Sequence, residues 1–94
     1  MIAAAMIAQG EIVYSPITHC KPLADTGLVG HDWETWSNFD KAFIDVCDSM
    51  IVVMAQGWAD SKGVTAETNY ARSQGKLVQC FTPDELMDRY PHAN

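Results

Sequence analysis

Residues 50–54 read Met-Ile-Val-Val-Met and are apolar at every position. A short run without polar alternation is typical of a β-strand whose two faces are both covered. Covering both faces requires helices on the two sides of a sheet. The run therefore predicts the central strand of a small α/β domain.

The rest of the chain alternates between helical and strand-like patterns. Helices and strands are predicted as follows: helices over residues 1–9, 31–47 and 64–74 and from Thr82 onward, strands over residues 11–15, 49–55 and 77–81. Residues 16–30, with two prolines and two glycines, are predicted to form a long loop. The alternation implies a parallel sheet in a three-layer α/β fold, Rossmann-like or flavodoxin-like, with helices on both faces.

Charge and cysteine content restrict the possible partners and the compartment. The 94 residues carry a net charge of −6, and the six lysines and arginines are scattered singly, which argues against a nucleic-acid polymer as ligand. No apolar run approaches the roughly 18 residues that span a membrane. Three cysteines without C-x-x-C spacing predict reduced thiols in a cytoplasmic protein.

The segment after the predicted central strand is the first candidate site. In parallel sheets, ligands bind beyond the carboxyl ends of the strands. Asp60, Ser61 and Gly63 lie just before a predicted helix, whose free backbone N–H groups and dipole attract anions such as phosphate. The alternative is that Asp60 or Ser61 only caps the helix. Trp58 could stack on a planar base or pack on the core.

Two carboxylates are candidates for chemistry. Glu67 falls in about the first turn of the helix predicted over residues 64–74, where the dipole is expected to lower its pKa and keep it ionised as a nucleophile. Asp40 borders the aromatic stripe of the preceding helix. If the two meet, one can attack and the other handle a proton, as in glycosidases. Each is alternatively an ordinary polar helix residue.

A metal or cofactor site is not expected. His19 with Cys20, and His31 with Asp32, lack the close regular spacing of structural zinc ligands. The sequence motifs of P-loops, dinucleotide-binding folds and serine hydrolases are also absent from the sequence.

Several segments together resemble one family. They are Tyr14-Ser15-Pro16-Ile17-Thr18-His19, Asp32-Trp33 with Asp40, Cys47-Asp48-Ser49-Met50-Ile51-Val52-Val53, and Gly57-Trp58-Ala59-Asp60-Ser61-Lys62-Gly63-Val64-Thr65-Ala66-Glu67. The chain is similar to the nucleoside 2-deoxyribosyltransferase-like superfamily, in particular to a small bacterial and phage branch near the 2′-deoxynucleoside 5′-monophosphate N-glycosidases. The resemblance implies one domain over residues 1–94 that begins after the family's first, central strand.

The resemblance also implies site roles. Glu67 matches the glutamate that attacks the anomeric carbon of a 2-deoxyribosyl group and releases the base. Asp40 matches the aspartate that assists the base or a sugar hydroxyl. Ser61 and Gly63 match the Ser-x-Gly pair that binds a 5′-phosphate in the nucleotide branch, and Asp60, Trp58 and His19 are further candidates for substrate binding.

The resemblance therefore predicts cleavage of an N-glycosidic bond, or deoxyribosyl transfer, on a nucleotide or nucleoside by a homo-oligomer that needs no cofactor. Because the first strand of the family forms a wall of the base pocket, the alternative is a non-catalytic nucleotide-binding or interaction module.

Overall fold

The apolar run at residues 50–54 supplies most of strand β1 (Ser49–Val53), which pairs in parallel with β2 (Leu77–Phe81). The register runs from Ser49 opposite Leu77 to Val53 opposite Phe81. The structure, a computed structural model, describes residues 2–91, and within them these two strands form the only sheet. The α/β class expected from the sequence is confirmed.

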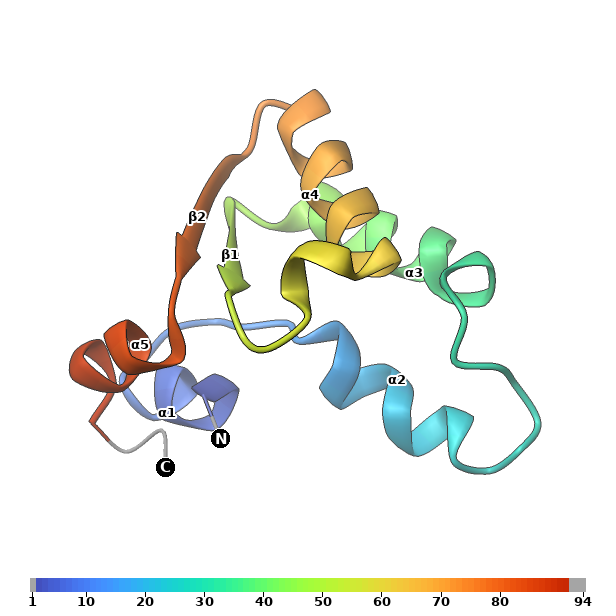
Figure 1. Cartoon of the computed structure of the whole chain (residues 1–94), viewed down its shortest axis with the longest axis horizontal. Coiled ribbons are helices and arrows are strands. Elements are labelled where there is room, and N and C mark those ends of the chain that lie inside the picture. Colours follow the sequence, from blue (N-terminus) through green and yellow to red (C-terminus); the bar gives the residue numbers. More distant parts are fainter. Residues whose placement is uncertain (1, 92–94) are drawn as a thin grey trace.

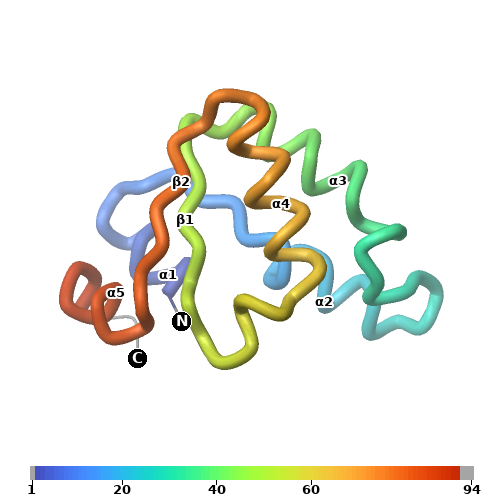
Figure 2. The backbone as a smooth tube through the Cα atoms, turned by 45° about the horizontal axis from the view of Figure 1, so that its top comes forward, coloured from blue at the N-terminus to red at the C-terminus, as the bar shows by residue number. Residues whose placement is uncertain are grey.

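Five α-helices surround this sheet in the described part of the chain (Figure 1). They are α1 (Ile2–Ala8), α2 (Pro16–Ala24), α3 (Trp33–Val46), α4 (Lys62–Ser73) and α5 (Pro83–Arg89), with a short 3-10 helix, η1 (Trp58–Asp60), between β1 and α4. Figure 2 shows α4 and α3 on one side of the two strands, and α1 and α5 near their other side. Among these residues, no helix is long and apolar enough to cross a membrane.

Strand alternation divides the core between the two faces of the sheet. On one face, Ile51, Val53 and Phe81 pack against the fully buried Leu86 of α5 and its buried neighbours. On the other face, Val52 is buried and α4 packs against both strands. Helices pack on both faces of β1, as the apolar run that begins at Met50 predicts.

Helix ends follow the local sequence signals closely. The Thr82 side chain accepts a hydrogen bond of 3.1 Å from the Glu85 N–H, and the Glu85 carboxylate accepts one of 2.9 Å from the Thr82 N–H. This is the capping box expected at the start of the last helix. Gly75 has a φ of +72° directly after α4, so the predicted glycine stop of that helix is confirmed.

Two predicted elements are wrong. Residues 11–15, predicted as a strand, are extended but pair with no strand in the described chain, and Ile12 is fully exposed. A β-prone sequence forms a strand only where a neighbouring strand offers hydrogen bonds. Residues 16–24, predicted as part of a loop, form α2, because Pro16 occupies the first helical turn, where a missing N–H costs nothing.

Candidate functional site

A cleft of about 450 Å³ lies between α2, α3 and α4. Its volume falls within the range of small-molecule sites. The lining residues come from the start of α2, from the first half of α3 with the turn before it, and from the first turns of α4: Pro16, Ile17, Cys20, His31, Asp32, Trp33, Glu34, Trp36, Asp40, Ser61, Lys62, Gly63, Val64 and Glu67. Helix α4 begins just after the loop that leaves β1, so this part of the lining lies where parallel sheets bind ligands.

Asp40 of α3 and Glu67 of α4 meet at this cleft. Their carboxyl groups are close enough to share a hydrogen bond, because α3 and α4 pack against each other. Asp40 is 4% exposed and is the only buried charged residue among residues 2–91, while Glu67 is partly buried. Buried carboxylates are rare in proteins and are frequent at functional sites, so this pair is the centre of the candidate site.

The environment of the pair raises both carboxyl pKa values. Burial, the charge of Asp40 and the hydrogen bond with Asp40 together raise the pKa of Glu67 to about 7. Burial also raises the pKa of Asp40, although hydrogen bonds from Glu67 and Tyr14 and the nearby His19 act in the opposite direction. Two neighbouring carboxyl groups do not both ionise easily, so we expect the pair to keep one proton below about pH 7.

The expected lowering of the Glu67 pKa is therefore wrong. Helix α4 begins at Lys62, two residues earlier than predicted, so Glu67 lies in the second turn rather than the first. The influence of a helix dipole falls off within the first turn. Burial and the Asp40 charge then dominate.

Tyr14 fixes the position of Asp40 from the extended segment before α2. Its hydroxyl donates a hydrogen bond of 3.4 Å to Asp40 Oδ1. The Tyr14 ring stacks on Phe43, one turn further along α3, with 3.9 Å between ring centroids and 1° between planes. Burial and the charge of Asp40 raise the pKa of the Tyr14 hydroxyl, so it stays protonated and remains a donor.

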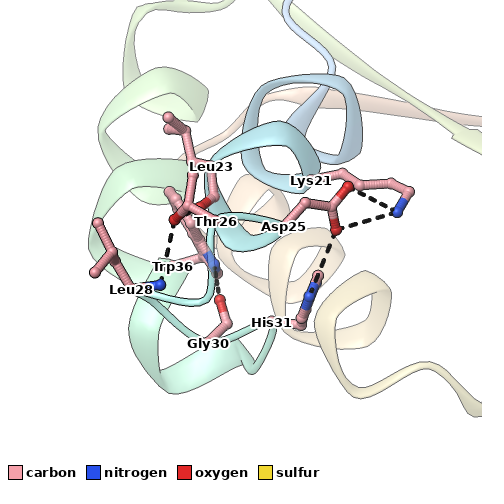
Figure 3. Close-up of polar contacts among 8 residues, drawn as sticks. All are labelled: Lys21, Leu23, Asp25, Thr26, Leu28, Gly30, His31 and Trp36. Atoms are coloured by element: carbon pink, nitrogen blue, oxygen red, sulfur yellow. Dashed lines mark hydrogen bonds and ion pairs between the residues drawn. The ribbon is translucent and has the colours of Figure 1, made fainter.

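The chain between α2 and α3 borders the cleft and is held by side-chain contacts (Figure 3). Trp36 Nε1 donates to the Gly30 carbonyl at 2.7 Å, which anchors this segment to α3. Asp25 accepts hydrogen bonds from Lys21 and lies 3.9 Å from the His31 ring nitrogen. His31 and Trp36, which take part in these contacts, both line the cleft.

Ser61 and Gly63 both line the cleft, at the start of α4. The Ser61 side chain is also the N-cap of this helix and accepts a hydrogen bond of 3.3 Å from the Val64 N–H. The capping interpretation of Ser61 is thus confirmed, while its carried-over role toward phosphate stays a prediction. Asp60 is exposed in η1 and is not part of the cleft lining.

The chain was compared with known proteins. Residues 1–82 match the family model described as a domain of unknown function, DUF1937. The chain belongs to the DUF1937 family. The match includes every residue that lines the cleft, so the Asp40–Glu67 pair lies within the DUF1937 domain. No curated protein and no solved structure matches the chain.

Besides Asp60, two more predicted substrate-binding residues of this DUF1937 domain do not line the cleft. Trp58 is half-buried and borders a separate hollow of about 260 Å³ that also includes Arg72 of α4. His19 is exposed, with its ring 5.6 Å from the Tyr14 ring and 6.2 Å from the Trp36 ring. His19 therefore lies beside Tyr14, close enough for its charge to lower the pKa of Asp40.

The cleft also contains residues to which the sequence assigned no site role. They are Trp33 and Trp36, which lie in the helix predicted over residues 31–47, and Cys20, which was considered only as a reduced thiol and in a metal site that is not expected. Burial and the charges of Asp40 and Glu67 raise the pKa of the Cys20 thiol. None of these has a sequence signal that separates a cleft residue from a core residue. Among residues 2–91, no group of three or more His, Cys, Asp or Glu side chains is arranged to hold a metal ion.

Gly63 gives the cleft its free space beside Glu67. A Cβ built on Gly63 would lie 3.9 Å from Glu67 Oε1 and 4.0 Å from the Trp33 ring, which is ordinary contact distance. We therefore expect Gly63→Ala to fold normally and to stabilise α4 by about 0.5–1 kcal/mol, while its methyl group occupies space that a ligand would use. Thermal unfolding measures the first effect, and affinity for nucleotides, the ligand class that the sequence resemblance predicts, measures the second.

Gly27→Ala is the contrasting control. Gly27 lies outside the cleft at a φ of +80°, so this change should destabilise the protein and leave affinity unaltered. Unchanged nucleotide affinity in Gly63→Ala would contradict the placement of the ligand beside Glu67.

Proposed function

We propose that this DUF1937 domain cleaves the N-glycosidic bond of a 2′-deoxynucleoside 5′-monophosphate, by hydrolysis or by transfer of the sugar. The observation that carries the proposal is the pair formed by Asp40 and Glu67, two neighbouring carboxyl groups from different helices beside a cleft, whose raised pKa values allow the pair to keep one proton. A protonated and an ionised carboxyl group at one site can supply an acid and a nucleophile together. The resemblance to the deoxyribosyltransferase-like superfamily supports the same roles.

The shared proton suggests how the pair divides the work. In the free cleft the proton belongs to Glu67, whose pKa is raised to about 7. A shift of this proton along the hydrogen bond to Asp40 leaves Glu67 as a carboxylate and Asp40 as an acid. One oxygen of Glu67 then bonds to the anomeric carbon, the carbon–nitrogen bond breaks, and its electron pair stays on the base, which takes the proton from Asp40. Water, or another base, next displaces Glu67 and returns a proton to Asp40.

The rest of the cleft is compatible with a nucleotide. Trp33 and Trp36 provide aromatic surface of the kind that stacks on nucleobases, and Ser61 lines the cleft at the start of α4. Tyr14 acts as a positioning residue, because it orients Asp40 without lining the cleft itself.

The test is release of free base from each of the deoxynucleotides and ribonucleotides, followed by chromatography. Deoxynucleotides are expected to react. Binding of these nucleotides with no release of base would favour the non-catalytic nucleotide-binding module instead.

The activity should also depend on pH in a defined direction. The pair needs one proton, so kcat/KM is expected to fall about tenfold per pH unit above the Glu67 pKa of about 7. It should also fall in acid, once Asp40 is protonated as well. Because a phosphate monoester itself titrates at pH about 6, the profile is measured with a deoxynucleotide and with its deoxynucleoside. An alkaline limb that is absent from both profiles would contradict the shared proton.

A further inference from the structure

An ion pair joins the two helices that carry the carboxyl pair. Lys62, the first residue of α4, donates a hydrogen bond from Nζ to Oε1 of Glu34 in the first turn of α3. Both residues line the cleft, and both side chains are largely exposed to solvent. Lys62 is therefore held at the cleft and is accessible to a ligand that enters it.

The charges of the cleft make Lys62 distinctive. Four acidic side chains line the cleft, namely Asp32, Glu34, Asp40 and Glu67, whereas Lys62 is the only lysine or arginine in the lining. The whole chain has a net charge of −6. A dianionic ligand is repelled by this surface as a whole, and Lys62 is the one formal positive charge in the lining that opposes the repulsion.

Lys62 is also suitably spaced from the reactive pair. It precedes Glu67 by five residues on α4, which corresponds to about 7.5 Å along the helix axis. A nucleoside 5′-monophosphate carries its phosphate and its anomeric carbon on opposite sides of the sugar. One end of such a ligand can approach Lys62 while the other approaches Glu67, and Gly63 leaves free space beside Glu67.

We propose that Lys62 is the counter-ion of the substrate's 5′-phosphate and that Glu34 holds its ammonium group in the free protein, so that nucleotide binding replaces the carboxylate by the phosphate. Glu34 then competes with the substrate and weakens its binding. This inference rests on the proposed function for the identity of the ligand. The hydrogen bond and the charge of Lys62 lower the pKa of Glu34, so the competing carboxylate stays ionised at neutral pH.

The experiment compares affinities for the four 2′-deoxynucleoside 5′-monophosphates with those for the matching 2′-deoxynucleosides. Trp33 and Trp36 line the cleft, so tryptophan fluorescence in the first moments after mixing reports binding before turnover. Lys62→Met should weaken nucleotide binding about tenfold or more and leave nucleoside binding unchanged. Glu34→Gln should tighten nucleotide binding about two- to fivefold, the range expected when an exposed ion pair is removed.

The control is Lys76, whose Nζ donates a hydrogen bond of 3.0 Å to the Asp45 carbonyl of α3, outside the cleft lining. Lys76→Met and Asp45→Asn remove the same kinds of charge away from the cleft and should change neither affinity. Loss of nucleotide preference in Lys62→Met, together with its increase in Glu34→Gln, supports the proposal even if no base is ever released, in which case only the enzymatic function fails. An unchanged preference in either variant, or failure of every nucleotide to bind the wild-type protein, overturns it.

Discussion

Replacing Glu67 by glutamine is expected to abolish base release while making the protein more stable above pH 7. Glutamine has nearly the shape of glutamate and can keep a hydrogen bond to Asp40, but its amide cannot attack the anomeric carbon. Loss of a nucleophile typically lowers kcat by at least about 10³-fold. The measurement is base release from the best deoxynucleotide, with nucleotide affinity determined in parallel to establish that the cleft is intact.

The gain in stability follows from the raised pKa. The Glu67 pKa is about 7 in the folded protein, against 4.5 for an ordinary glutamate, so the folded state binds more protons than the unfolded state between these values. The free energy of unfolding therefore falls as the pH rises from 4.5 to about 7 and stays lowered above that. Since Glu67 is only partly buried, solvent screening reduces the cost to about 1–2 kcal/mol at pH 8.

Glutamine carries no proton to lose, so Glu67→Gln should raise the midpoint of thermal unfolding at pH 8 and leave it nearly unchanged at pH 4. Each kcal/mol corresponds to roughly 4–8 °C in a domain of this size. Glu34→Gln is the matched control: because Lys62 lowers the Glu34 pKa, its removal should not stabilise the protein at pH 8. Equal unfolding midpoints for Glu67→Gln and wild type at pH 8 would show that ionisation of Glu67 does not destabilise the folded protein.

The sequence predicted those elements whose signals are local. The capping box at Thr82 and the glycine stop after α4 depend on neighbouring residues only, and both are confirmed. The strand at residues 77–81 is also confirmed, because β1 lies beside it and pairs with it. The strand predicted at residues 11–15 depended on a partner that no local pattern specifies, and the pattern alone was insufficient. Pro16 and Pro22 obscured α2, because proline signals both a loop and a helix start.

The candidate site was predictable in part. The sequence identified Asp40 and Glu67 as separate candidates for chemistry, but only the packing of α3 on α4 brings their carboxyl groups together. The direction of the Glu67 pKa could not be obtained from the sequence, because it depends on burial and on a charge 27 positions away in the chain. The ion pair between Lys62 and Glu34 has the same origin. Contacts across packed helices decide the electrostatics of this cleft, and sequence patterns do not specify them.

Asp40→Asn is expected to lower the pKa of Glu67 and to slow base release by about 10²- to 10⁴-fold. Asparagine removes the negative charge that opposes ionisation of Glu67, so the Glu67 pKa should fall from about 7 toward 4.5, and burial alone should keep it above that value. Base release slows because the departing base no longer receives a proton, and general acids contribute an effect of this size. Carbon NMR titration of the Glu67 carboxyl group measures the pKa directly.

The matched control is Asp45→Asn on the same helix. Asp45 accepts a hydrogen bond of 2.6 Å from the Tyr70 hydroxyl of α4, so it is another carboxylate between α3 and α4, but it lies outside the cleft lining. Asp45→Asn should leave both the Glu67 pKa and base release unchanged. If the Glu67 pKa stays near 7 in Asp40→Asn, burial alone sets it and the two carboxyl groups do not share a proton. A lowered pKa with unimpaired base release would retain the pair but assign protonation of the base to another group.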